Sequence, residues 1–291
     1  MNEEVVRWGD LFTKAKESLS SAGVEAADIE ARWIVEKASG YEGSEFIAGL
    51  EKPATALGVT HLKKILARRL GGEPLQYSLG SWGFRNLDLF VDKRVLIPRP
   101  ETERLVDIAI SLLMKSTGNA DKLVADLGTG SGAVGLSIAD ECSDAEVILV
   151  DNSEDALQVA AANLAGLGNN ARKVRILQSS WFEAFPEELQ QSFSLIVSNP
   201  PYIANGEDLP VEVLHWEPHI ALYAGVKGTE HIETILTEAR RWLKQNGNVA
   251  IEMAPHQIDL MSAKAEKIGY SNIEVHNDLS QRPRVMSCTW K

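Results

Sequence analysis

One stretch decides the fold, and it reads Val124-Ala125-Asp126-Leu127-Gly128-Thr129-Gly130-Ser131-Gly132. An apolar strand pattern ends within it, and a helical pattern begins after it. The three glycines have no Cβ atom, so the backbone can turn tightly there and a ligand can approach it closely. Asp151 closes the next expected strand, where a carboxylate can accept both hydroxyl hydrogens of a ribose. The stretch therefore predicts a site for a nucleoside-containing ligand.

The spacing of the glycines separates two classes of such ligand. It is G-x-G-x-G, not the G-x-G-x-x-G pattern that presents a helix N-terminus to a pyrophosphate. Asp126 also precedes the glycines, at a position that suits the cationic amino-acid end of S-adenosylmethionine. Together these features favour S-adenosylmethionine over a dinucleotide. A structural turn or a site for another nucleotide is the alternative interpretation.

Strand and helix patterns alternate around this stretch. Short buried strands are expected at Lys122–Leu127, Glu146–Asp151, Val174–Gln178, Phe193–Ser198 and Asn248–Met253. Helices are expected at Glu101–Lys115, Ala133–Asp140, Glu154–Leu167, Glu230–Gln245 and His256–Ile268, and a terminal strand pair at Ile273–His276 and Arg284–Trp290. Such alternation predicts a parallel sheet that is covered by helices on both faces.

The beginning of the chain has a different pattern. Apolar residues recur at helical spacing up to Leu70, including helices expected at Ala27–Ala38 and Thr60–Leu70. Alternating residues then predict a β-hairpin with its turn at Arg85-Asn86. The sequence thus predicts three parts, which are an N-terminal helical domain over residues 1–75, a hairpin linker over residues 76–100 and a sheet domain over residues 101–291.

A second motif, Asn199-Pro200-Pro201-Tyr202, directly follows the expected strand Phe193–Ser198. The carboxyl ends of parallel strands line one crevice, so this loop should face the same opening as the glycine turn. Two consecutive prolines stiffen the backbone and remove two N–H donors. What remains is a rim of acceptors, made by the Asn199 side-chain oxygen and backbone carbonyls.

Such a rim suits methyl transfer to a planar nitrogen. The nitrogen of an amide or exocyclic amine is a poor nucleophile because its lone pair is delocalised. If Asn199 and the Pro200 carbonyl accept its two hydrogens, the lone pair can be directed at a sulfonium methyl group, and positioning alone lowers much of the barrier. Tyr202 offers a flat face on which a planar target can stack. The alternative is an ordinary proline turn with a packed tyrosine.

Composition excludes several classes of protein. The chain has 291 residues, 44% of them hydrophobic and 24% charged, which is typical of a globular protein of about two domains. Its longest apolar runs, such as Ile220–Ala224, are far shorter than the ~20 residues of a membrane helix. The net charge is −12, and residues 86–291 carry −11 of it, so long-range attraction to nucleic-acid phosphates is weak there.

Cysteine usage and the N-terminus bear on the compartment. Cys142 and Cys288 cannot form a disulfide framework, and no Cys/His cluster has the spacing of a zinc site, so no metal is expected. The first residues carry acid in place of the basic segment of a secretory signal. A reducing cytoplasm is the expected location.

Four segments carry a resemblance to a known family. They are Gly72–Tyr77, the linker Leu96–Glu103, Asp126–Gly130 and Asn199–Tyr202. On these segments, and over nearly its whole length, the chain resembles the PrmC/HemK family of bacterial protein-(glutamine-N5) methyltransferases, which modify peptide chain release factors. The Asn-Pro-Pro-Tyr motif alone is shared with DNA adenine methyltransferases. Its combination with the linker and a helical N-terminal domain is much more specific.

The resemblance implies a fold, an activity and partners. The fold is that of a class I S-adenosylmethionine-dependent methyltransferase, Rossmann-like, with a seven-stranded, mostly parallel sheet whose last strand is antiparallel. The implied reaction methylates the glutamine of the Gly-Gly-Gln motif in release factors 1 and 2, which tunes translation termination and leaves S-adenosyl-L-homocysteine as product. It implies no direct nucleic-acid or membrane partner, and the N-terminal helical domain becomes a candidate for binding the release factor.

The resemblance also implies site residues. Those for the cofactor are Asp126, Leu127, Gly128, Thr129, Gly130, Asp151, Trp181 and Asn199. The substrate pocket is Asn199, Pro200, Pro201 and Tyr202, of which Asn199, Pro200 and Tyr202 are the catalytic candidates. Ser180 stands where the family often has aspartate, so it is left out of the site.

Several other residues have two interpretations. Arg99, Glu101 and Thr102 either close over the cofactor or have a capping and salt-bridging role at a helix start. Glu217 has either a site role or a loop role. Histidines such as His231 are expected to be structural or on the surface. Two rival functions are a DNA adenine methyltransferase, which would use the same motif on a flipped base, and a non-catalytic module that binds cofactor and release factor.

Overall fold

The computed structural model describes residues 6–115 and 122–291, so the expectation about the first five residues lies outside the described part of the chain. The chain divides into two compact units, one ending at Gly80 and one from Ser81 to Lys291. The positions of the two units relative to one another are not determined.

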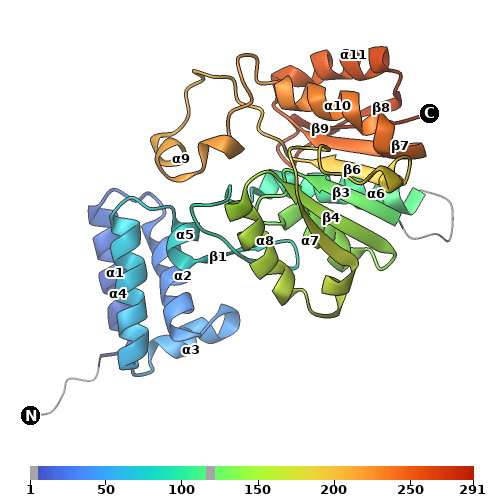
Figure 1. Cartoon of the computed structure of the whole chain (residues 1–291). Helices are drawn as coiled ribbons and strands as arrows, with labels where there is room; N and C mark the ends of the chain where they lie inside the picture. The colour runs from blue at the N-terminus through green and yellow to red at the C-terminus, as the bar shows by residue number, and fades with distance from the viewer. Residues whose placement is uncertain (1–5, 116–121) are drawn as a thin grey trace, which may run out of the picture. The chain divides into compact units, whose positions relative to one another are not determined.

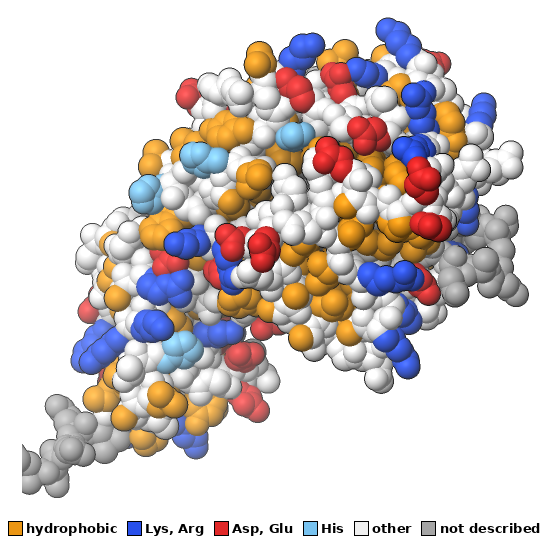
Figure 2. Space-filling model, in the orientation of Figure 1, with side chains coloured by type: hydrophobic (Ala, Val, Ile, Leu, Met, Phe, Trp, Pro, Cys, Tyr) orange, Lys and Arg blue, Asp and Glu red, His pale blue; other side chains and the backbone are white. Residues whose placement is uncertain are grey.

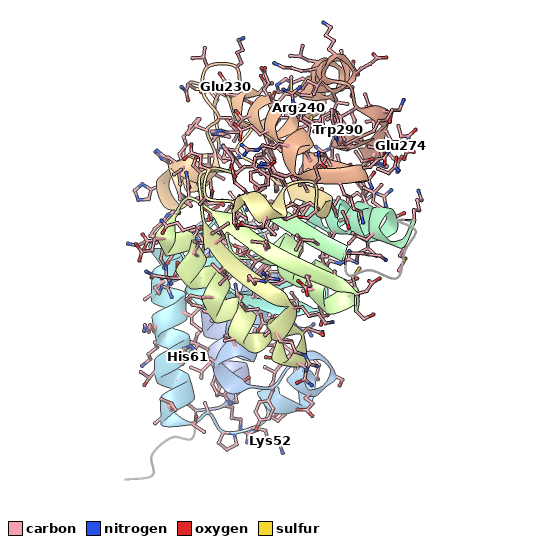
Figure 3. The ribbon with its side chains drawn as sticks, turned by 45° about the vertical axis from the view of Figure 1, so that its right-hand side comes forward. Lys52, His61, Glu230, Arg240, Glu274 and Trp290 are labelled. Carbon is pink, nitrogen blue, oxygen red and sulfur yellow. The ribbon has the colours of Figure 1, made fainter. Side chains whose placement is uncertain are left out.

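The first unit is helical. Its helices are α1 (Trp8–Ser21), α2 (Ala27–Ser39), the 3₁₀ turn η1 (Gly43–Glu45), α3 (Phe46–Leu50), α4 (Ala56–Leu70) and α5 (Leu75–Leu79). Trp8, Leu19, Ile34 and Ile65 are among the buried side chains of its own core. His61 lies on the exposed side of α4 (Figure 3).

Local contacts explain two differences from the sequence prediction in this unit. Helix α4 begins before Thr60 because the Thr55 hydroxyl accepts the Gly58 N–H at 3.1 Å, which caps the helix at Thr55. The unit extends beyond residue 75 because α5 packs against α2 and α4.

The second unit holds the sheets. The seven-stranded sheet has the order β5-β4-β3-β6-β7-β9-β8. Its strands are β3 (Lys122–Leu127), β4 (Ala145–Asp151), β5 (Val174–Gln178), β6 (Phe193–Ser198), β7 (Leu243–Glu252), β8 (Ser271–Asn277) and β9 (Pro283–Thr289). Neighbours from β5 to β7 are parallel, whereas β9 is antiparallel to both β7 and β8. The expected seven-stranded, mostly parallel sheet with an antiparallel last strand is confirmed.

Helices cover both faces of this sheet (Figure 1). The α-helices are α6 (Glu103–Lys115), α7 (Ala133–Glu141), α8 (Glu154–Gly166), α9 (Val211–Trp216), α10 (Glu230–Trp242) and α11 (Ile258–Ile268). Short 3₁₀ turns are η2 (Pro100–Thr102), η3 (Gly168–Lys173), η4 (Glu187–Leu189), η5 (His219–Ala221) and η6 (Pro255–Gln257).

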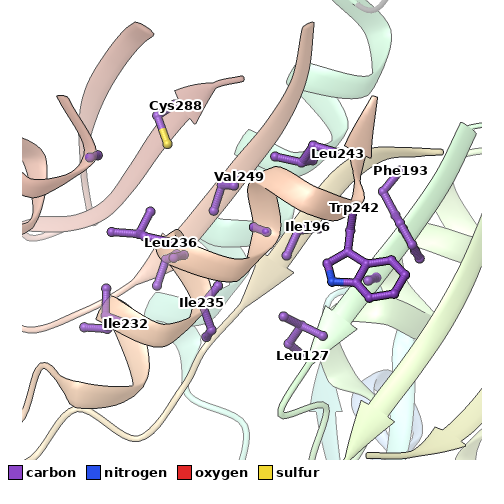
Figure 4. Close-up of a cluster of buried hydrophobic side chains, with 14 of the residues drawn as sticks. Leu127, Phe193, Ile196, Ile232, Ile235, Leu236, Trp242, Leu243, Val249 and Cys288 are labelled. Carbon is purple, nitrogen blue, oxygen red and sulfur yellow. The ribbon is translucent and has the colours of Figure 1, made fainter. Parts of the chain in front are cut away.

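Strand alternation sends neighbouring side chains of β3 to opposite faces. Leu127 points into a hydrophobic core (Figure 4). This core also contains Ile235 and Trp242 of α10 and Phe193 of β6. Asp126 points the other way, toward α7, where the Gly135 N–H donates to it. Two consecutive residues of β3 therefore serve different parts of the unit, since Leu127 belongs to the apolar core and Asp126 to the polar site.

The expected hairpin is present but belongs to the second unit. Strands β1 (Ser81–Phe84) and β2 (Leu87–Phe90) pair antiparallel around the turn at Arg85-Asn86. Asn163 of α8 fastens the hairpin, since its side-chain oxygen accepts the Phe90 N–H at 2.7 Å and its amide donates to the Phe90 carbonyl at 3.0 Å.

The C-terminal part differs from the sequence prediction at one boundary. Helix α10 ends at Trp242, not Gln245, because Leu243 already pairs with Phe193 and begins β7. At the far end of the unit Trp290 packs edge-on against Tyr270, with ring centroids 5.4 Å apart (Figure 3).

Candidate active site

The glycine turn connects β3 to α7 and requires its glycines. Gly128, Gly130 and Gly132 have φ values of +69°, +55° and +85°, in the left-handed region that side chains disfavour. A Cβ on Gly132 would also lie 2.8 Å from the Leu136 side chain. The turn is fixed to β4 by the Thr129 N–H, which donates to the Val150 carbonyl at 2.9 Å.

Asp126 is a buried carboxylate on the lining of a cavity at this edge of the sheet. It is 1% exposed, and its Oδ2 accepts the Thr129 hydroxyl at 2.6 Å and the Gly135 N–H at 2.9 Å. Burial, with a smaller contribution from the nearby Asp151, raises its pKa to about 6 despite these two bonds. A bound cation would offset this cost.

This cost predicts an unusual effect of Asp126→Asn. A carboxyl whose folded-state pKa is raised contributes stability only at low pH, and loses it as the pH rises through about 6. We expect the free energy of unfolding of the variant at pH 8 to exceed that of wild type by about 1–3 kcal/mol, and this gain to shrink at pH 5. Thermal unfolding at both pH values measures it.

Asp144→Asn is the matched control. Asp144 is exposed and ion-paired with Lys122 at 2.7 Å, an interaction that lowers its pKa, so its replacement should slightly destabilise the protein at pH 8. Equal behaviour of the two variants would contradict the burial argument.

Asp151 ends β4 and links the turns that follow β3 and β4. Its Oδ2 accepts the Gly130 N–H at 2.9 Å, and its Oδ1 accepts the Ser153 N–H at 3.0 Å. Burial raises its pKa. Each oxygen retains a lone pair, and the residue lines the same cavity as Asp126, so it can accept hydroxyl hydrogens there.

Trp181 supplies an aromatic wall to this cavity. Its backbone is left-handed, with φ of +50°, and its ring lies near Gly128, where an added Cβ would come within 3.6 Å of it. His231 of α10 packs against the ring at a centroid distance of 5.1 Å and also lines the cavity. Burial lowers the pKa of His231, which favours its neutral form. The sequence predicted a structural or surface role for His231, and the structure adds that its ring lines this cavity.

The Asn-Pro-Pro-Tyr loop follows β6 at the same edge. The Ser198 hydroxyl donates to the Leu127 carbonyl at 2.7 Å, which joins the ends of β6 and β3. The Asn199 side-chain amide donates to the Thr102 hydroxyl at 3.1 Å. Asn199 and Pro201 therefore meet the glycine turn in one cavity.

The predicted site residues separate into two groups. Those that line this one cavity are Asp126, Gly128, Thr129, Gly130, Asp151, Trp181, Asn199 and Pro201. Leu127 lies in the core, Pro200 is buried, and Tyr202 packs against the core, where burial raises its pKa to about 12. The Tyr202 carbonyl accepts the Gln257 amide at 2.8 Å, which fixes the loop from behind.

Further lining residues come from distant parts of the chain. Arg99 and Thr102 line the cavity, and Arg99 forms an ion pair with the buried Glu217. Glu217 also accepts the Ile97 N–H at 3.1 Å. The sequence left the roles of these residues open, because only the fold shows which of them meet.

Within residues 6–115 and 122–291, no three His, Cys, Asp or Glu side chains gather as a metal ion would require. In the same ranges no helix is both long enough and apolar enough to cross a membrane.

Comparisons with known proteins agree with this architecture. A family model described as "Methyltransferase small domain" matches residues 102–215, and one described as "PrmC N-terminal domain" matches residues 10–80. The release factor glutamine methyltransferase of Salmonella typhimurium is 37% identical, over 88% of this chain and 90% of its own. That of Agrobacterium fabrum is 34% identical, over 94% of each chain.

This chain belongs to the release factor glutamine methyltransferase family. The resemblance drawn from the four motif segments is therefore confirmed. The chain spans about half the length of other relatives, such as the bifunctional methyltransferase of Rickettsia typhi, which is 31% identical over 95% of this chain and 56% of its own.

Solved structures support the methyltransferase fold of this family member. The catalytic domain of hMettl16, in complex with MAT2A 3′UTR hairpin 1, matches with a TM-score of 0.59 at 13% identity, over 78% of this chain and 80% of that one. A methyltransferase from Pyrococcus furiosus matches with a TM-score of 0.50 at 18% identity, over 77% and 96%. At these identities the likeness concerns the fold alone.

Proposed function

We propose that this protein transfers a methyl group from S-adenosyl-L-methionine to the side-chain amide nitrogen of the glutamine in the Gly-Gly-Gln motif of release factors 1 and 2, in the cytoplasm. One observation carries the proposal. Asn199 lines the same cavity as Asp126 and Asp151. The side-chain oxygen that would accept a hydrogen from the substrate amide therefore shares one opening with the two carboxylates that would bind the cofactor.

The residues present fit S-adenosylmethionine. Asp126 is a desolvated carboxylate whose burial a cationic amino group would offset, and Asp151 keeps acceptor capacity for ribose hydroxyls. Trp181 offers a flat wall for an adenine ring. When bound, this cosubstrate supplies a methyl group made electrophilic by its sulfonium centre.

The chain itself contributes position. The Asn199 amide group donates to Thr102, so its oxygen remains free to accept a hydrogen from the substrate amide. That bond, with one to a backbone carbonyl of the loop, would turn the nitrogen lone pair toward the methyl carbon. The nitrogen forms a bond to the methyl carbon as the sulfur–carbon bond breaks and S-adenosyl-L-homocysteine leaves, and the nitrogen releases one proton to water. Oriented in this way, a weak nucleophile reacts without a strong base.

The N-terminal helical unit is the proposed contact for the release factor. The support is the match of residues 10–80 to the PrmC N-terminal domain and the separate core of this unit. Binding assays with the full chain and release factors 1 and 2 address it.

Mass spectrometry of release factor incubated with the protein and cofactor tests the proposed reaction. We expect a gain of one CH₂ group on a single glutamine of each factor. Absence of any gain would indicate a non-catalytic binder, and methylation of duplex DNA instead would indicate an adenine methyltransferase. The net charge of −11 over residues 86–291 argues against DNA as the substrate. On the face that Figure 2 shows, acidic and basic side chains are interspersed over the second unit.

A further inference from the structure

Glu252 is a buried carboxyl that the proposed chemistry does not use. It is the last residue of β7 and is 2% exposed. Its Oε2 has no hydrogen-bond partner among the described residues. A buried polar oxygen without a partner costs free energy, so its presence calls for a physical reason.

The neighbours of Glu252 belong to the site. Burial raises its pKa to about 7, whereas hydrogen bonds from the Thr102 hydroxyl and the Asn199 amide hold it down. Glu252 itself is not among the residues that line the cavity, whereas Thr102 and Asn199 are. The carboxyl therefore lies behind two residues that line the cavity.

A structural ion pair does not account for this carboxyl. Arg284 of β9 attracts the Glu252 carboxylate. Arg284 is also shared with a second carboxylate, because its Nε lies 3.8 Å from Oδ2 of the buried Asp278. Glu101 of η2 repels Glu252, and Glu252 in turn raises the pKa of Tyr202. Arg284, Glu101 and Tyr202 are thus charged or titratable groups that interact with the carboxyl, and Asp278 is the ion-pair partner of Arg284.

The Asn199 NH₂ group donates to the Thr102 hydroxyl at 3.1 Å, and both side chains approach the Glu252 carboxyl closely enough to lower its pKa. The Thr102 hydroxyl can both donate and accept, so it alone does not determine which end of the Asn199 amide turns toward it. A carboxylate accepts only. With an anion at position 252, the Thr102 hydroxyl donates to it, and its oxygen is left to accept from the Asn199 NH₂ group.

We propose that Glu252 is a positioning residue, whose carboxylate holds the NH₂ group of Asn199 inward and thereby presents the Asn199 oxygen to the acceptor amide. The inference rests on the proposed function. When Glu252 carries a proton it can donate to Thr102, the hydroxyl can then donate to the Asn199 oxygen, and the amide can turn over. The NH₂ group would then face the cavity and could not accept the substrate hydrogen.

Glu252→Gln tests the proposal because glutamine keeps the shape but can donate. We expect kcat to fall about 10- to 100-fold at saturating cofactor, with an unchanged Kd for S-adenosylmethionine. In wild type kcat should rise with pH through about 7, and this rise should disappear in the variant. A purely structural role would leave the pH profile in place.

The other titrating carboxyl of the site is separable from this readout. Asp126, with a pKa of about 6, faces the cofactor, so its protonation should change the cofactor Kd more than kcat at saturation. Wild-type activity on release factor is measured first, because its absence would refute the proposed function and not this inference. A Glu252→Gln variant with wild-type kcat and pH profile, or with proportional losses of kcat and cofactor binding, overturns the inference.

A second pair of variants covers the case in which Glu252→Gln does not fold. Thr102→Ser keeps the hydroxyl and should retain most of kcat and the pH dependence, whereas Thr102→Val removes the hydroxyl and should lose both. Equal kcat in the serine and valine variants would overturn the proposal.

Discussion

Asn199→Ala is expected to lower kcat for methyl transfer by about 10²- to 10³-fold, the effect typical of removing one preorganised polar contact at a reacting group. The Kd of S-adenosylmethionine should change by no more than a few-fold. The reason is that in the proposed arrangement the Asn199 amide, which donates to Thr102, orients the acceptor, whereas Asp126 and Asp151 bind the cofactor. Single-turnover kinetics and calorimetry measure the two quantities separately.

Asn205→Ala is the matched control for this variant. Asn205 is an exposed asparagine of the same loop region, and its backbone N–H donates to the Gly225 carbonyl at 2.7 Å. Its replacement should leave both quantities unchanged. Equal losses of cofactor affinity and turnover in Asn199→Ala would contradict the separate role of Asn199 in orienting the acceptor.

Asp151→Ala is expected to weaken cofactor binding by about 10- to 100-fold, because hydrogen bonds to a charged group contribute about 1.5–3 kcal/mol. At saturating cofactor kcat should stay close to wild type. The carboxylate also accepts the Gly130 and Ser153 N–H groups, so part of the loss comes from a looser turn.

Two further variants separate these contributions. Asp151→Asn keeps one acceptor oxygen and should lose less affinity than Asp151→Ala. Asp155→Ala changes an exposed carboxylate in the first turn of α8 and should have no effect. Unchanged affinity in Asp151→Ala, measured by calorimetry, would contradict the assignment of Asp151 to the ribose.

Much of the fold was predictable because its signals are local. The strand pattern before Gly128 and the helical pattern after Gly132 fix one β–turn–α unit, and alternation repeats it along the chain. The boundary between α10 and β7 was not predictable, because Leu243 becomes a strand residue through its pairing with Phe193. Such a contact between distant residues leaves no local signal.

The site was predictable where it coincides with a motif. Asp126 and Asn199 stand at the carboxyl ends of neighbouring strands, and the structure brings them to one cavity. Strand alternation explains why Leu127, one residue later, lies in the core instead.

The rest of the site depends on contacts between distant segments. Arg99 meets Glu217, and Glu252 meets Thr102, only after the sheet has formed. Their isolated residue types match many structural roles, so sequence alone does not distinguish among them.

The most direct test of the central claim is a crystal structure with bound S-adenosyl-L-homocysteine. The account predicts the adenine against Trp181, the ribose hydroxyls within hydrogen-bonding distance of Asp151 and the sulfur facing Asn199. Density that places the sulfur away from the Asn-Pro-Pro-Tyr loop, in a cavity that Asn199 does not reach, would contradict it.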